Sequence, residues 1–228
     1  MSDTVLILRT CDSDLRSWGG FQWPEHGYIE APDWDPEPCC GKGLHGLLWG
    51  EGRGGLLDWG KKAKWLVVEA LASDVVDLDG KVKFKAGEVI YAGSFKGALA
   101  VLDSRPEARK AAVVGAQRLT GTHGTAITGY RGLAVAENYG VAVAGNCGTA
   151  TAVYRGTATA GDCGTATAGH CGTATAGHHG TAKAGYNGIL VISYWEDRRR
   201  TAVGYVGEGG IEPDRAYRLN DDGKFVET

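Results

Sequence analysis

The sequence has little proline, little net charge and no long hydrophobic run. Six prolines stand against 37 glycines without a Gly-X-Y period, which excludes a collagen-like chain. A formal net charge of −3 argues against general nucleic-acid binding. No run reaches the ~18 apolar residues of a membrane helix, and the start lacks a secretory signal. We therefore expect no membrane association, a cytoplasmic location and mostly reduced cysteines.

The middle of the chain, residues 111–188, is an almost uncharged repeat with 2 acids and 4 bases. Its unit of eight residues reads Gly-Thr-Ala-Thr-Ala-Gly-x-x. The first position is held by Gly124, Gly132, Gly140, Gly148, Gly156, Gly164, Gly172, Gly180 and Gly188. Thr-Ala-Thr-Ala alternates with period two and predicts a strand, and Gly-x-x-Gly predicts a corner in which glycine takes a positive φ. So short a strand must stack on copies of itself, which predicts a β-solenoid.

Irregularities in the repeat indicate the size of one coil. The sixth position is Glu137 in one octad and Val153 sixteen residues later, and Cys147 and Cys163 have the same spacing. This favours two octads per coil and a two-sided solenoid of four coils over 124–187. A coil of 24 residues with three sides, or a trimer in which each chain supplies one side, remains open. The nearly invariant alanines at positions three and five are predicted to face inward.

Positions two and four are then predicted to face outward. In the early octads they are apolar, and we expect another copy of the chain or the N-terminal segment to cover them. These residues are Leu133, Val135, Val141 and Val143. The candidate interface continues over Thr149, Thr151, Thr157, Thr159, Thr165 and Thr167. A homo-oligomer is expected. The same Thr-x-Thr rows are similar to those of ice-binding solenoids, in which spaced hydroxyls and methyls order water.

The flanking segments predict a mainly β protein with four parts. The expected strands of the first part are Val5–Arg9, Trp65–Leu71, Lys81–Lys85 (half exposed) and Glu88–Tyr91. Ser104 is expected to cap a helix with Pro106 in its first turn. We predict a small α+β domain at 1–102, a helical connector at 103–115, the solenoid at 116–188 and a β-hairpin cap at 189–228. The cap protects the open solenoid edge.

Motifs at both ends carry a resemblance. Cys40-Gly41-Lys42-Gly43-Leu44-His45, a Val68-Glu69 strand and Ile211-Glu212-Pro213-Asp214-Arg215-Ala216-Tyr217-Arg218-Leu219 occur in this order. The chain thereby resembles an uncharacterised family encoded by phages and prophages, although its repeats are rich in Thr-Ala rather than Ser. The resemblance implies an intracellular setting in an infected or lysogenic bacterium and no established activity.

Candidates for chemistry are few. The run Gly41–His45 followed by Trp65–Glu69 is similar to a strand of ADP-ribosyltransferases, which implies Arg9, His45 and Glu69 as catalytic counterparts, but His45 replaces the aromatic residue and no Ser-Thr-Ser motif exists. The metal candidates are Cys39, Cys40 and His45, and, at the repeat corners, Cys163 and His179. Buried thiols in a turn and freely varying corner residues are favoured over a metal site, and no cofactor is expected. Arg198, Arg199 and Arg200 are read as a solvated turn, with phosphate binding as the alternative.

Without a convergent catalytic constellation, the sequence favours a non-enzymatic phage binding protein. It would self-associate through its solenoid and interfere with a host or defence component, by occluding a protein or capturing a small nucleotide. An ADP-ribosyltransferase-like enzyme and an ice-binding solenoid are the alternatives.

Overall fold

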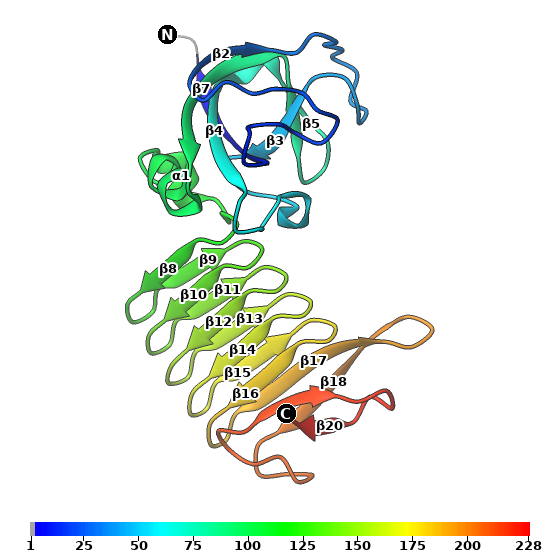
Figure 1. The fold of residues 1–228 in the computed structure, drawn as a ribbon. Helices are drawn as coiled ribbons and strands as arrows, with labels where there is room; N and C mark the ends of the chain where they lie inside the picture. The colour runs from blue at the N-terminus through cyan, green and yellow to red at the C-terminus, as the bar shows by residue number, and fades with distance from the viewer. Residues whose placement is uncertain (1–2) are drawn as a thin grey trace. The chain divides into compact units, whose positions relative to one another are not determined.

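The computed structural model describes residues 3–228, and the chain divides into two compact units after Val113. The first unit is an antiparallel sheet with short helices, and the second is a β-solenoid with a β cap (Figure 1). The predicted fold class, mainly β with a solenoid of octad repeats, is confirmed.

A seven-stranded sheet with the order β2-β7-β4-β1-β3-β6-β5 forms the first unit. Its strands are β1 (Thr4–Cys11), β2 (Gly27–Glu30), β3 (Leu44–Leu48), β4 (Lys64–Leu71), β5 (Val75–Asp77), β6 (Val82–Phe84) and β7 (Ala86–Gly93). The long apolar runs of β1 and β4 lie at its centre, where Leu66, Val67 and Val68 are completely buried. Two 3₁₀ turns, Gly54–Leu56 and Ala72–Asp74, flank β4.

Four of these strands coincide with expected ones, namely β1, β4, β6 and β7, whereas β2, β3 and β5 were not foreseen. The expectation that the β6 segment is half exposed is wrong. Val82, Lys83 and Phe84 are all buried, because β6 is hydrogen-bonded to β3 on one side and to β5 on the other.

The helices also differ from the expectation. The first is α1 (Phe95–Leu102), which was not foreseen and is capped by the Ser94 hydroxyl accepting from the Gly97 amide at 3.2 Å. The second is α2 (Pro106–Lys110), which begins with proline as predicted but has Arg105 at its N-cap without a side-chain bond. The Ser104 hydroxyl donates backward to the Val101 carbonyl instead, at the end of α1. Only 106–110 of the expected connector is helical.

Ten short strands build the solenoid. They are β8 (Gln117–Thr120), β9 (Thr125–Thr128), β10 (Leu133–Ala136), β11 (Val141–Ala144), β12 (Thr149–Ala152), β13 (Thr157–Ala160), β14 (Thr165–Ala168), β15 (Thr173–Ala176), β16 (Thr181–Ala184) and β17 (Ile189–Trp195). Even-numbered strands form one parallel sheet and odd-numbered strands the other, so a coil has two sides and 16 residues, as predicted. There are five coils rather than four, because β8 and β17 pair in register with β10 and β15 although their sequences leave the octad pattern.

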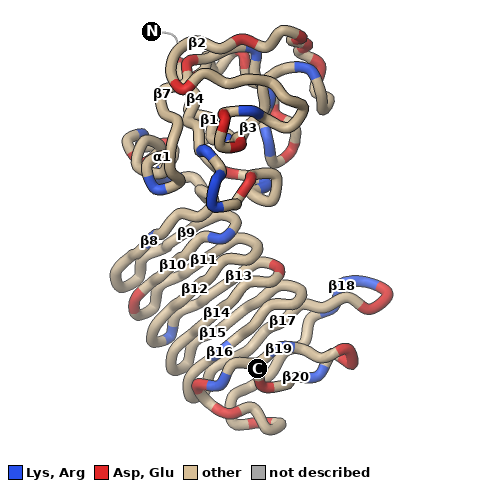
Figure 2. The backbone as a smooth tube through the Cα atoms, viewed as in Figure 1, with Lys and Arg blue, Asp and Glu red and all other residues tan. Residues whose placement is uncertain are grey.

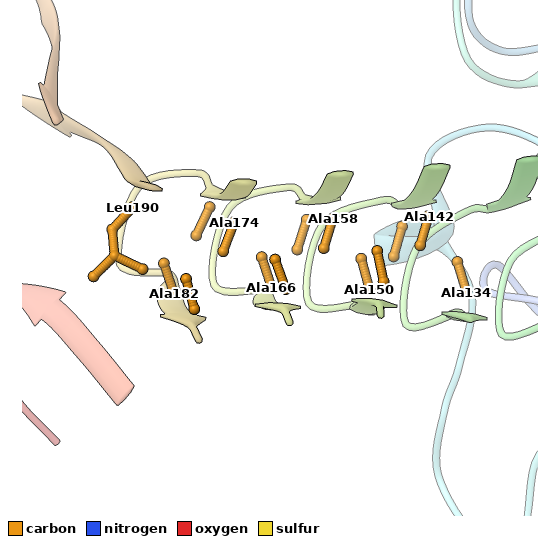
Figure 3. Close-up of a cluster of buried hydrophobic side chains, with 14 of the residues drawn as sticks. Ala134, Ala142, Ala150, Ala158, Ala166, Ala174, Ala182 and Leu190 are labelled. Atoms are coloured by element: carbon orange, nitrogen blue, oxygen red, sulfur yellow. The ribbon is translucent and has the colours of Figure 1, made fainter. Parts of the chain in front are cut away.

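Alanine fills the space between the two sheets. The inward positions three and five carry alanines that are at most 3% exposed, and Figure 3 shows alanines of both sheets pointing into the space between them. Methyl groups are small enough to let two backbones approach closely over their whole length. In the last coil the inward residues become Leu190 and Ile192, which pack with Ile211, Tyr217 and Phe225 of the cap.

The corner glycines are required by close approach, which corrects the expected positive φ. A Cβ on Gly164 would lie 2.8 Å from the Ala160 Cβ and 2.9 Å from the Gly148 carbonyl oxygen of the previous coil. The residue before each such glycine takes the left-handed conformation instead, as at Cys163 with φ 55° and His179 with φ 56°. L-residues adopt this conformation at a cost of roughly 1–2 kcal/mol.

Antiparallel strands close the C-terminal end of the solenoid. They are β18 (Arg199–Tyr205), β19 (Ala216–Leu219) and β20 (Phe225–Glu227). Strand β18 pairs with β17 and β19 pairs with β16, so both sheets receive a cap strand. Charged residues gather in this cap and in the first unit, and the coils between them are nearly free of charge (Figure 2). Arg199 donates to the Ser193 hydroxyl and Arg200 pairs with Glu196, which gives both arginines structural partners.

Candidate functional site

One solenoid face carries threonine on three consecutive coils. Parallel register places Thr149 beside Thr165 and Thr165 beside Thr181 on β12, β14 and β16. A second row runs beside it, in which Thr151 lies next to Thr167 and Thr167 next to Lys183. We call the surface of Thr149, Thr151, Thr165, Thr167 and Thr181 the even threonine face.

The opposite sheet has a smaller array. Thr157 and Thr159 on β13 lie beside Thr173 and Thr175 on β15. These four residues form the odd threonine face. The distribution of threonines over two sides agrees with the sequence prediction, because the 16-residue coil sends alternate octads to alternate sheets.

The geometry of the threonine faces is set by the backbone. Outward side chains on one strand are two residues apart, which is roughly 6.6 Å, and neighbouring coils are roughly 4.7–4.9 Å apart. In the described chain none of the nine threonine hydroxyls has a protein hydrogen-bond partner, and every one is exposed or partly exposed. The faces therefore present regular rows of hydroxyl and methyl groups to solvent.

Apolar side chains border both faces toward the N-terminal coils. Leu133 and Val135 precede the even face, and Val141 and Val143 precede the odd face. Val141 is 37% exposed and the other three are partly buried. Burial of this border against a second copy of the chain stays a prediction.

The corner residues form columns along the solenoid, as the coil length requires. Tyr154 and His170 stack at 5.6 Å between ring centroids, and His123 stacks on Tyr139 at 5.0 Å. Cys163 and His179 occupy the same corner position one coil apart, where the Cys163 amide donates to the His178 carbonyl. No group of three metal-ligating side chains occurs among residues 3–228.

The catalytic candidates of the first unit do not form one constellation. Glu69 accepts from the Thr4 hydroxyl and pairs with Arg105, and it lines a cavity that Arg9 and His45 do not reach. Arg9 and His45 meet, because the guanidinium donates to the His45 carbonyl at 3.2 Å. A structural role for Glu69 accounts for its contacts.

Exposed cysteines lie beside this pair. Cys39 and Cys40 are both exposed, and the ammonium of Lys81 donates to the Cys40 sulfur at 2.9 Å. This bond lowers the pKa of Cys40 below its ordinary value. Sequence reasoning missed Trp18, Lys81 and Lys83 as neighbours of Arg9 and His45. The local signal for this site was Lys83, a lysine between two apolar residues in β6.

Comparisons with known proteins gave two kinds of match. Residues 5–101 match a family described as a domain of unknown function, DUF7666. An ice nucleation protein of Pseudomonas fluorescens is 37% identical over 100 residues, which is 43% of this chain and 8% of the relative. InaU of Pantoea ananas and an ice nucleation protein of Pseudomonas syringae are also 37% identical, each over 40% of this chain and over 9% and 8% of the relative. The chain thus spans less than a tenth of these relatives. No solved structure matches.

These matches correct the location expected from the sequence. A cytoplasmic setting is wrong, because the curated relatives are ice nucleation proteins, whose named activity concerns ice and not a partner inside an infected cell. Among the described residues, no helix is both long enough and apolar enough to cross a bilayer.

Proposed function

We propose that the solenoid binds ice through the even threonine face. The observation that carries the proposal is the in-register stacking of Thr149, Thr165 and Thr181 with hydroxyls that have no protein partner. The similarity to ice nucleation proteins supports it independently. Ice binding thereby replaces the phage binding protein as the leading interpretation of this chain.

The physical basis of ice binding is a preorganised surface, in which the protein holds the threonines in place without help from water. Parallel ladders hold every coil, and the buried alanines fix the distance between the sheets. β-branched threonine has few side-chain rotamers, so little entropy is lost when its hydroxyl and methyl contact ordered water. Rows with spacings of roughly 4.7–4.9 and 6.6 Å then hold water in a repeating arrangement.

The size of the face favours adsorption to existing ice over nucleation of new ice. Threonine occupies three coils on the even face, which extends over about 10 Å between its outermost strands. The relatives are more than ten times longer than the matched segment. A nucleus of ice needs a template much larger than three rungs, whereas a crystal surface needs only local contact.

A loss-of-function variant tests the face directly. We expect Thr165→Glu/Thr167→Glu to reduce thermal hysteresis and crystal faceting to the buffer baseline, because two carboxylates interrupt the centre of the array. The carboxylate introduced at position 167 lies beside Lys183 on the neighbouring strand, so Thr165→Glu/Thr167→Glu creates no like-charge pair between strands. Circular dichroism should be unchanged.

Two controls assign the activity to this face. Thr157→Glu/Thr159→Glu places the same charges on the odd face and should retain most of the hysteresis. Tyr186→Glu adds a carboxylate at a corner that is 64% exposed and should have no effect. Equal loss in all three variants, or an inactive parent protein, would refute ice binding by the even face.

A gain-of-function variant sharpens the test. Lys183 interrupts the row that begins with Thr151 and Thr167. Lys183→Thr extends this row by one coil, and we expect higher hysteresis at equal protein concentration. Lys183→Gln removes the charge without restoring the hydroxyl and methyl pair, and it should give a smaller gain.

Self-association through the apolar border is a separate prediction. Leu133, Val135, Val141 and Val143 stay partly accessible to solvent, which suits a second copy of the chain. Light scattering coupled to size exclusion should show an oligomer, and Leu133→Asp should shift it to monomer. A monomeric parent protein with the same solubility as Leu133→Asp would rule the interface out.

A further inference from the structure

A second candidate site lies in the first unit, far in sequence from the threonines. Two cavities of about 430 and 320 Å³ share Arg9, Trp18 and His45 in their walls. Cys40 and Lys81 line the larger cavity, and Phe21 and Trp23 line the smaller one. Both volumes fall in the range of roughly 300–1,000 Å³ that is typical of small-molecule sites. We call the two together the Arg9 pocket.

The Arg9 pocket has an excess of positive charge. The Arg9 guanidinium lies 3.7 Å over the Trp23 ring and donates to the backbone carbonyls of His45 and Thr10. Among residues 3–228, the two cations of the walls, Arg9 and Lys81, form no ion pair with a carboxylate. Asp33 is the one acid in the walls, and its carboxylate accepts from the Gly43 amide.

The positive charges around the pocket act on His45. Burial lowers the pKa of His45, and the positive charges of Lys81, Arg9 and Lys83 lower it further. Lys42 adds no net positive charge, because its ammonium is paired with the Asp35 carboxylate at 3.1 Å.

Polar nitrogens without partners belong to three residues of the pocket walls. Arg9 Nε, Trp23 Nε1 and His45 Nε2 are buried and have no hydrogen-bond partner. A buried polar group without a partner destabilises the fold, and a charged one does so most. Three of them in the walls of one pocket indicate a region organised around an acceptor that the protein itself does not supply.

Trp18 adds a second kind of contact. It lies in the walls of both cavities, yet it is fully exposed, with a relative accessibility of 104%. A tryptophan in this position contributes no burial to the fold. Its indole face is open to a planar ring, which stacks on such a platform without regard to the identity of the base.

We propose that the Arg9 pocket binds a small phosphorylated ligand with a planar ring, of the nucleoside monophosphate class. The phosphate lies at Arg9, His45 and Lys81, where arginine offers paired donors and lysine a point charge. The ring stacks on Trp18. This site is independent of the threonine faces and of ice.

The experiment uses the full chain and calorimetric titration with AMP, adenosine and inorganic phosphate at fixed ionic strength. AMP is expected to bind at least tenfold more tightly than either fragment, because both halves of the pocket contribute. Trp18→Ala should weaken AMP binding about tenfold and leave phosphate binding unchanged. Arg9→Met should weaken both AMP and phosphate.

Matched variants separate binding from folding. Trp195→Ala removes another exposed tryptophan, in the solenoid unit, and should leave AMP binding unchanged. Lys81→Met provides a second loss of charge without altering the stacked Arg9, and it should weaken AMP binding even if Arg9→Met fails to fold. Bound AMP should also slow alkylation of Cys40 by iodoacetamide.

Three results would overturn the proposal. The first is no saturable AMP binding by the folded protein, and the second is equal binding of AMP and phosphate, which would remove the ring from the site. The third is AMP binding that Trp18→Ala and Lys81→Met leave intact.

Discussion

The two units of this chain make β-sheets by opposite means. In the solenoid, the octad strands bury alanine methyl groups at nearly every inward position, and adjacent strands are 16 residues apart throughout. In the first unit, the sheet order β2-β7-β4-β1-β3-β6-β5 joins distant segments around large side chains such as Trp23, Leu66 and Phe84. Solenoid order therefore comes from repetition, whereas the first unit depends on individual, non-repeated contacts.

The difference determines where each unit has room for function. A solenoid coil uses its inward positions for alanine and its corners for glycine, which leaves the outward positions free to vary. The first unit instead has cavities of about 510 and 430 Å³. A repeated flat surface suits an extended, repetitive partner such as a crystal, and a cavity suits a single small molecule.

The largest expected effect on stability comes from a substitution in the core of the first unit. Leu66→Ala removes a completely buried side chain from β4, and we expect the free energy of unfolding to fall by about 3 kcal/mol. Leu71→Ala on the same strand, where the side chain is 41% exposed, should cost much less. Hydrogen exchange of the β4 amides and denaturant unfolding measure both. Similar losses for the two variants would contradict the assigned core.

The next largest effect on stability comes from a substitution at the corner of one coil. Gly164→Ala places a Cβ 2.8–2.9 Å from Ala160 and from the Gly148 carbonyl oxygen, and we expect a cost of about 2 kcal/mol. Gly55→Ala is the control in the first unit, because its added Cβ meets nothing within 4 Å. Thermal unfolding followed by circular dichroism compares them. A neutral Gly164→Ala would mean that coils shift easily and that the threonine rows are not rigid.

A smaller effect is stabilising. Thr128 occupies an inward position that alanine holds elsewhere, and its buried hydroxyl has no partner. Thr128→Val keeps the shape and replaces the hydroxyl by a methyl group, so we expect a gain of about 1 kcal/mol. Denaturant unfolding measures the gain, with Thr125→Val on the exposed face of the same strand as the neutral control. A loss of stability would indicate an acceptor for this hydroxyl in solution.

The contrast also explains what sequence reasoning could and could not predict. Gly-Thr-Ala-Thr-Ala repeats predicted the inward alanines, and the sixteen-residue spacing of Glu137 and Val153 favoured the observed coil length over a coil of 24 residues, because each inference needed only local spacing. The fifth coil was missed, because β8 and β17 lack the octad sequence pattern. They belong to the solenoid because they pair with its first and last repeat strands. The glycine role was misread, because the contact that demands glycine comes from the previous coil. In the first unit, four strands were foreseen, but the meeting of Arg9, Trp18 and Lys81 depends on loops whose course no local pattern encodes.

The smallest expected effect is the pH dependence of stability that arises from His45. Burial and the cations around it lower the pKa of His45, so the unfolded chain binds the proton more readily than the folded protein. Stability is therefore intact above the unfolded pKa, and it falls as the pH drops through that value toward the folded pKa. Denaturant unfolding between pH 7.5 and 5 (about one unit above and about 1.5 units below the ordinary histidine pKa of ~6.5) should show this slope in the parent protein and a shallower one in His45→Gln. His26→Gln, which replaces an exposed histidine of the same unit, serves as the control for loss of an imidazole. If His45→Gln retains the full slope, the charge cluster around Arg9 does not act on this imidazole, and the positive field inferred for the Arg9 pocket loses its support.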